Sequence, residues 1–248
     1  MSKRQEIREQ RRRSRMRNQI IIIALIVVGV LLVVYAVINS TLRPPVNQGT
    51  STIVVTPITP RANNVQMSGT SMGDPNAPVK MDVWEDFQCS GCLFYTNTLE
   101  PQIIQTYVET GKVYYTFHFI PFIDGTSGES HQAANAAMCA NEQGRFWDYH
   151  DMLFANWVGE NAGSYIDVRL VAFANQLGLD MTKFNKCFKA NTYADQINQD
   201  AQAGQAKGVP PTPGIFVNGV MVTSPRGATL IPSFDEISTV IEAALKGH

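Results

Sequence analysis

The chain reads Val79-Lys80-Met81-Asp82-Val83-Trp84 and, after four further residues, Cys89-Ser90-Gly91-Cys92. The first stretch alternates apolar and polar residues, as in a half-buried strand. From Cys92 to about Glu109 the apolar residues have helical spacing, and Gly111 ends that helix. Lys112 to Phe122 is dense in Val, Tyr, Phe and Ile and predicts a second strand. Strand, helix, strand in this order predicts a βαβ unit with parallel strands and a right-handed crossover.

The pattern changes to helices from about residue 127 to residue 207 and then returns to strands. Asn218-Gly219 separates the apolar runs Ile215–Val217 and Val220–Val222, which is a strong signal for a hairpin. Phe234–Leu245 has the spacing of an amphipathic closing helix. The order βαβ, helical insert, ββα predicts an α/β protein with a thioredoxin fold interrupted by an α-helical domain. The helices predicted within the insert span residues 131–142, 145–157, 168–177, 181–190 and 193–206.

Two cysteines, Cys89 and Cys92, stand where the first strand meets the first helix. Disulfide exchange needs a thiolate that attacks and a nearby thiol that resolves the mixed disulfide. The free N–H groups and dipole of the first helical turn favour a thiolate at Cys89, and Cys92 lies one turn inward. We therefore predict a redox-active pair with Cys89 as the nucleophile and Cys92 as the resolving thiol. The alternatives are a structural turn disulfide or a zinc half-site, although Cys139 and Cys187 offer no second CxxC.

Four segments of the chain resemble the DsbA-like thiol-disulfide oxidoreductases, particularly the membrane-anchored kind, and the similarity covers about residues 70–247. The resemblance implies that Thr212–Pro213 is a cis peptide bond facing the cysteines. A cis proline there would leave the Thr212 backbone free to pair with an extended substrate strand, so Thr212 and Pro213 join the predicted catalytic residues. An ordinary trans loop proline is the alternative. The segments are Gly73–Pro78, Asp86–Cys92, Phe146–His150 and Gly208–Gly219.

The sequence departs from the family at two places. The residues between the cysteines are Ser90-Gly91, without the Pro or His common among strong oxidants. Six residues before the first cysteine, where the family often has a buried acid, this chain has Val83. Glu85 and Asp86 are close in sequence, but a shift of two or three residues changes the depth and can change the face of the strand. The proton route to the resolving thiol is therefore left open.

The two remaining cysteines, Cys139 and Cys187, fall in predicted helices of the insert. Four cysteines in an exported chain suggest complete pairing, so we expect a structural disulfide between these two. Similar proteins of the family carry such a second bridge. Two separate buried thiols are the alternative.

The net charge of −1 conceals a strong asymmetry. Residues 1–17 carry eight Lys/Arg and two Asp/Glu, whereas the acidic remainder is a poor match for nucleic acid. Ile20–Ile38 is an uncharged apolar run long enough for a helix to cross a bilayer. We expect a cytoplasmic head (1–18), an uncleaved transmembrane signal anchor (19–39), a flexible linker (40–72) and the catalytic domain outside (73–248). A buried core helix and a cleaved signal peptide are the alternatives.

Other candidate residues favour packing over chemistry. The aromatic cluster of the insert could line a peptide groove, but such clusters are more often core. His118, His131 and His150 have no spacing that requires catalysis or a metal, although His131 could lie near the cysteines. The aromatic residues concerned are Phe146, Trp147, Tyr149, Phe154 and Trp157.

The sequence therefore predicts a membrane-tethered, extracytoplasmic thiol-disulfide oxidoreductase that oxidises thiols of exported proteins through Cys89 and Cys92, without a cofactor or metal. The expected partners are reduced or unfolded exported proteins, the bilayer through residues 20–38, and a membrane quinone-linked oxidase of the DsbB or vitamin K epoxide reductase type. A reductase or isomerase, as in cytochrome maturation, is the alternative within the enzyme class. A tethered peptide-binding or chaperone module is the alternative outside it.

Overall fold

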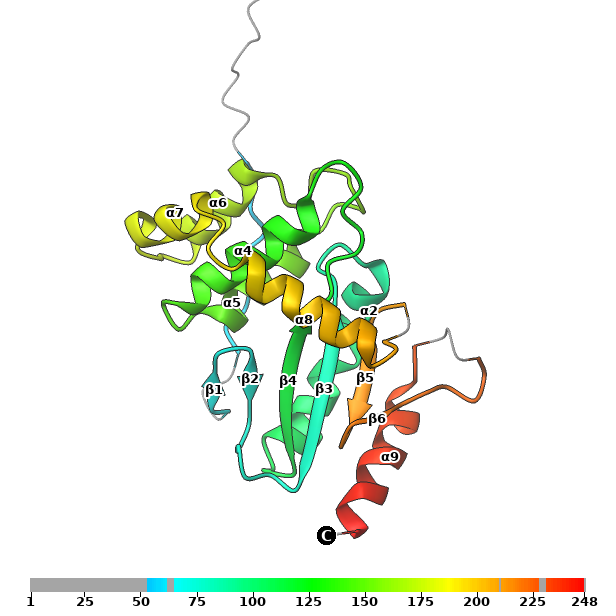
Figure 1. Cartoon of the computed structure of the whole chain (residues 1–248). Helices are drawn as coiled ribbons and strands as arrows, with labels where there is room; N and C mark the ends of the chain where they lie inside the picture. The colour runs from blue at the N-terminus through cyan, green and yellow to red at the C-terminus, as the bar shows by residue number, and fades with distance from the viewer. Residues whose placement is uncertain (1–52, 62–64, 210, 228–230, 248) are drawn as a thin grey trace, which may run out of the picture. The chain divides into compact units, whose positions relative to one another are not determined.

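A computed structural model of the chain describes residues 53–61, 65–209, 211–227 and 231–247 (Figure 1). The predicted cytoplasmic head (1–18), the transmembrane anchor (19–39) and the first part of the linker lie outside these residues. Among the residues that are described, no helix is both long enough and apolar enough to cross a membrane.

The centre of the fold is one six-stranded sheet with the order β1-β2-β4-β3-β5-β6 (Figure 1). β3 and β4 run parallel along seven paired positions, from Val79 opposite Val113 to Glu85 opposite Phe119. β5 pairs antiparallel with β3 on its other side. The strands are β1 (Met67–Ser68), β2 (Ser71–Met72), β3 (Val79–Glu85), β4 (Val113–Phe119), β5 (Gly214–Val217) and β6 (Val220–Met221).

The crossover from β3 to β4 is helical, as predicted, but it is not one continuous helix. It consists of α2 (Ser90–Thr98), α3 (Glu100–Ile103) and a π-helical turn, η1 (Ile104–Val108). Pro101 has no backbone N–H and cannot continue the hydrogen-bond pattern of α2, so the chain restarts as a separate turn. The predicted βαβ unit is confirmed, with this break as the difference.

The insert contains the five expected helices: α4 (Glu129–Asn141), α5 (Phe146–Ala155), α6 (Asp167–Gln176), α7 (Met181–Lys189) and α8 (Ala194–Ala206). A disulfide between Cys139 and Cys187, with the Cα atoms 5.7 Å apart, joins α4 to α7. The aromatic cluster is core rather than groove, because Phe146, Trp147, Tyr149 and Phe154 are all buried. The chain then returns through β5 and β6 to α9 (Phe234–Lys246), which begins with a capping box of Ser233 and Glu236.

Helix α8 of the insert packs against one face of the sheet, next to β4 (Figure 1). Gly204 lies against the Trp84 indole so closely that a Cβ there would stand 2.7 Å from the ring. The His118 ring stacks on the Trp84 ring, with the ring centres 4.2 Å apart, and hydrogen-bonds to Asp82 and Asp200. Burial alone would lower the pKa of His118, but these two carboxylates raise it to about 9. Strands β3 and β4 are thus held firmly at the end where the cysteine motif follows.

The folded part begins earlier than the predicted boundary at residue 73. β2 pairs antiparallel with β4, and Thr56 exchanges hydrogen bonds of 2.7 and 3.0 Å with the side chain of Asn156. Residues 53–55 do not form a strand. The linker prediction was wrong for this part, because two-residue strands and single polar contacts leave no periodic signal in the sequence.

Candidate active site

The two cysteines of the CxxC motif lie at the start of α2. Cys89 is the N-cap residue, with only 8% of its surface exposed, and Cys92 in the first turn is fully buried. Both thiols are free in the structure. The parallel strand β3 ends four residues before Cys89, so the sheet delivers the motif to its carboxyl edge. This places one sulfur at the surface and the other beneath it.

The surroundings of Cys89 favour the thiolate. A hydrogen bond from the Cys92 thiol is the largest influence, burial opposes it, and the N–H groups of Gly91 and Cys92 add to it. Together they lower the pKa of Cys89 to about 6. The Cys89 sulfur is therefore largely ionised at neutral pH, while an unperturbed thiol is not.

Cys92 has the opposite character, and a buried carboxyl group accompanies it. Burial, followed by the hydrogen bond to the Cys89 sulfur and the charge of Glu85, raises the pKa of Cys92 well above its ordinary value. Glu85 is itself 1% exposed, and burial and the charge of Glu100 raise its pKa strongly. Hydrogen bonds from Cys92 and from Thr96 oppose that rise. The two groups are therefore positioned to exchange a proton.

Glu85 is a buried acid beside the resolving thiol, whose proton route the sequence left open because Val83 stands at the family's acid position. Val83 and Glu85 are two residues apart on β3, so their side chains point to the same face of the sheet. Glu85 lies nearer the carboxyl end of the strand, where α2 begins. The period of the strand could have identified this carboxylate, but its depth depends on how α2 and α3 pack over it.

Thr212–Pro213 is a cis peptide bond, and it lies beside Cys89. The Thr212 carbonyl accepts a hydrogen bond from Cys89 Sγ at 3.5 Å. A Cβ on Gly91 would stand 3.1 Å from that carbonyl oxygen and 3.5 Å from Cys89 Sγ. Glycine at this position therefore permits the close approach of the Thr212 loop to the start of α2. All four residues predicted for the site, Cys89, Cys92, Thr212 and Pro213, are brought together.

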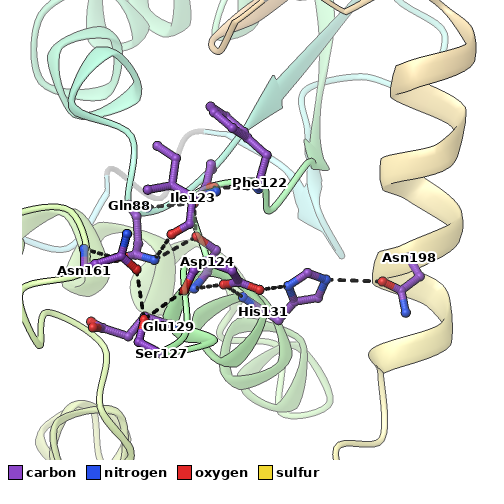
Figure 2. Close-up of polar contacts among 11 residues, drawn as sticks. Gln88, Phe122, Ile123, Asp124, Ser127, Glu129, His131, Asn161 and Asn198 are labelled. Atoms are coloured by element: carbon purple, nitrogen blue, oxygen red, sulfur yellow. Dashed lines mark hydrogen bonds and ion pairs between the residues drawn. The ribbon is translucent and has the colours of Figure 1, made fainter.

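Gln88, the residue before Cys89, was not singled out by sequence reasoning. Its side chain is fully buried and joins two loops (Figure 2). The amide nitrogen donates to Ser130 Oγ at 3.0 Å and to the Ile123 carbonyl, and the amide oxygen accepts from the backbone N–H of Asn161 at 2.7 Å. Trp157 Nε1 donates to the Gln88 carbonyl at 2.9 Å. These bonds fix the insert against the backbone that carries Cys89.

The three histidines considered earlier have other partners. Figure 2 shows the His131 imidazole between the Asp124 carboxylate and Asn198 of α8, with 3.2 Å from Nε2 to the Asn198 oxygen. His150 is buried beside Asp151 at 2.9 Å, and His118 belongs to the α8 contact. Within the described part of the chain, none of them hydrogen-bonds to a cysteine of the motif.

Replacing Glu85 by Gln tests whether the carboxyl group exchanges protons with Cys92. We expect closure of the Cys89–Cys92 disulfide by oxidised glutathione to slow about tenfold or more, because a positioned carboxylate contributes at least that much to proton transfer. Acid quenching followed by alkylation and mass spectrometry gives the rate. Glu242→Gln, which removes an exposed carboxylate on α9, is the matched control.

Glu85→Gln should also change the pH dependence of the free energy of unfolding. The pKa of Glu85 in the folded chain lies above the ordinary 4.5, so the folded state keeps a proton that the unfolded state has lost. The free energy of unfolding therefore falls as the pH rises from the ordinary value through the folded one, and Glu85→Gln lacks this fall. Urea unfolding at about pH 5 and about pH 8 measures it. Equal pH slopes together with an unchanged closure rate would contradict a proton-exchange role.

Comparison with known proteins agrees with this geometry. A family model described as thioredoxin matches residues 66–242. The chain is 27% identical over 184 residues to the probable disulfide bond formation protein D of Bacillus cereus, which covers 71% of this chain and 78% of that protein.

Two solved structures show the same fold. The oxidised crystal structure of BdbD from Bacillus subtilis matches with a TM-score of 0.62 and 23% identity, over 78% of this chain and 99% of that one. The crystal structure of Chlamydia trachomatis DsbA matches with a TM-score of 0.59 and 20% identity, over 77% of this chain and all of that one. The chain thus belongs to the thioredoxin family and is a DsbA-like protein thiol-disulfide oxidoreductase.

Proposed function

We propose that this oxidoreductase works as an oxidase, transferring the Cys89–Cys92 disulfide to thiols of exported proteins. The observation that carries the proposal is the position of Cys89 at the N-terminus of α2 beside the buried Cys92, which lowers the Cys89 pKa. A thiolate stabilised in the folded protein stabilises the reduced form, and the disulfide of a pair that is stable when reduced is a strong acceptor of electrons. The helix start and the Cys92 thiol both favour this state.

The reaction balances as two thiol-disulfide exchanges. A substrate thiolate attacks the Cys89 sulfur of the oxidised pair, the Cys89–Cys92 bond breaks, and Cys92 leaves and takes up a proton. The second substrate thiolate then attacks its own partner sulfur in the mixed disulfide, and Cys89 leaves as a thiolate. Two electrons pass from the substrate to the pair. Glu85 is the group beside Cys92 that exchanges the proton in this scheme.

The Thr212–Pro213 loop is proposed to hold the substrate. Its position beside Cys89 would allow an extended peptide to pair with the Thr212 backbone while its cysteine reaches the sulfur. Re-oxidation requires a partner that accepts two electrons from the reduced pair. A membrane quinone-linked oxidase of the DsbB or vitamin K epoxide reductase type would supply this step.

A redox titration with a turnover assay tests the direction of electron flow. We expect a reduction potential less negative than that of thioredoxin, about −270 mV, and catalysed oxidation of a reduced, unfolded ribonuclease in glutathione buffer. Cys89→Ser should abolish catalysis, and Cys92→Ser should accumulate a mixed disulfide with the substrate. A potential as negative as that of thioredoxin, with an ordinary Cys89 pKa, would replace the oxidase by a reductase.

The proposal includes a membrane anchor with the domain on the outer side. It is supported by the apolar run of residues 20–38, by the basic residues that precede it, and by the Cys139–Cys187 disulfide, which suits an oxidising compartment.

Protease treatment of spheroplasts that express the full chain tests this topology. Because basic residues stay on the cytoplasmic side, we expect loss of the catalytic domain and protection of a tag placed at the N-terminus. A domain that stays intact until the cells are lysed would contradict the topology and the oxidising compartment with it.

A further inference from the structure

Arg61 lies in the segment that leads into the domain, and its side chain reaches two carboxylates. Its guanidinium bonds Glu100 Oε2 at 2.8 Å and both oxygens of Asp151, at 2.5 and 2.8 Å. It also lies 4.8 Å from the centre of the Trp147 ring and 3.3 Å from His150 Nδ1. The Arg61 side chain is 15% exposed and that of Glu100 only 2%. This is an interior ion pair, in which the loss of one partner has large consequences.

The cationic position among these groups is filled by the arginine. Glu100, His150 and Asp151 bring ligand atoms within 4.8 Å of one another, an arrangement that could suit a metal ion. Arg61 bonds to all three, so the positive charge comes from the chain itself. The question is what this charge does.

Glu100 connects the ion pair to the redox centre. Thr96 and Glu100 are one helical turn apart, and both line a cavity of about 460 Å³ together with Arg61. Thr96 Oγ1 donates to Glu85 Oε2 at 3.4 Å, and Glu85 lies against Cys92. The charge of Glu100 is also the largest influence on Glu85 after burial.

Two buried tyrosines complete the surroundings of these carboxyl groups. Tyr95 of α2 and Tyr115 of β4 are fully buried, and burial is the main cause that raises both phenol pKa values. The charges of Glu85 and Glu100 come next for Tyr95, and those of Tyr95 and Glu100 come next for Tyr115. The titratable groups around Glu85 and Glu100 are thus Cys89, Cys92, Tyr95, Tyr115, Arg61, His150 and Asp151. Arg61 is the only arginine or lysine among these groups in the described part of the chain.

We propose that Arg61 is a positioning residue of the redox centre, which pairs with Glu100 and so cancels a buried negative charge that would otherwise oppose the Cys89 thiolate. It acts through Glu100 and Glu85, and it contacts neither sulfur. Because the segment 53–61 carries it, and Asn156 holds that segment at Thr56, the chain leading into the domain contributes a charge to the active site.

Two substitutions that change the local charge in opposite directions test this proposal on the purified full chain in detergent. Arg61→Gln leaves Glu100 uncompensated and should raise the Cys89 pKa. Glu100→Gln removes a buried negative charge while Arg61 still pairs with Asp151, and should lower the Cys89 pKa. We expect each shift to be about half a unit or more, the size of effect that one partly buried charge exerts over an intermediate distance. Thiolate absorbance of the reduced chain against pH gives the pKa, and equilibration with glutathione should give the more negative potential for the variant with the higher Cys89 pKa.

Further variants separate charge from packing. Arg61→Lys keeps the charge and should behave like the wild type, and the double variant Arg61→Gln with Glu100→Gln should return toward it. Arg145→Gln is the matched control. It removes the ion pair with Asp148, a carboxylate that lies on α5 as Asp151 does but that does not line the cavity.

The comparison between Arg61→Gln and Glu100→Gln decides the proposal. If Glu100→Gln has the same Cys89 pKa as Arg61→Gln, or a higher one, the proposal is overturned and the pair is merely structural. If Arg61→Gln does not fold, Glu100→Gln against the wild type decides alone: a lower Cys89 pKa supports the proposal, and an unchanged one overturns it.

Discussion

Stabilisation of the Cys89 sulfur as a thiolate is the interaction on which the rest of the site depends. It needs hydrogen-bond donors on one side of the sulfur, and these are the Cys92 thiol and the N–H groups of the first turn of α2. It also needs a partner thiol that does not compete for the charge, and burial provides this by raising the pKa of Cys92. The two cysteines of one short motif are therefore driven in opposite directions, Cys89 by its hydrogen-bond donors and Cys92 by burial.

The surrounding fold keeps that depth constant. The parallel pair β3–β4 brings the motif to the edge of the sheet, and α8 clamps the pair through Trp84 and His118. Gln88 ties the insert to the residue just before Cys89. Glycine at position 91 lets the Thr212 carbonyl come close to the sulfur. Each of these contacts positions backbone rather than reacting groups, and together they define where Cys89 lies relative to its hydrogen-bond partners.

The sequence was sufficient to predict the features that depend on a periodic pattern or on one short motif. The βαβ unit, the Asn218-Gly219 hairpin and the helices of the insert follow from periodicity and turn chemistry. The burial of Glu85 and the ion pair of Arg61 could not be predicted, because both depend on packing between segments far apart in the sequence. The Glu85 carboxyl group is buried only when α2 and α3 cover it. Arg61 has both of its carboxylate partners only when α3, which carries Glu100, packs near α5, which carries Asp151. The break between α2 and α3 had a local signal in Pro101, but the helical spacing of the apolar residues from Cys92 to Glu109 favoured one continuous helix.

The central claim is that the folded protein favours the reduced pair, and urea unfolding of the reduced and oxidised chain measures this directly, with the Cys139–Cys187 bridge kept intact in both. A Cys89 pKa of about 6 in the folded state contributes stability to the reduced form that is fully present above the ordinary thiol pKa and is lost as the pH falls from that ordinary value through the folded one. We predict that the reduced form is the more stable one at neutral pH, with about 1 kcal/mol of the difference due to this group, and that the difference shrinks on acidification. An oxidised form that is more stable at neutral pH, or a difference that does not change with pH, would contradict the claim.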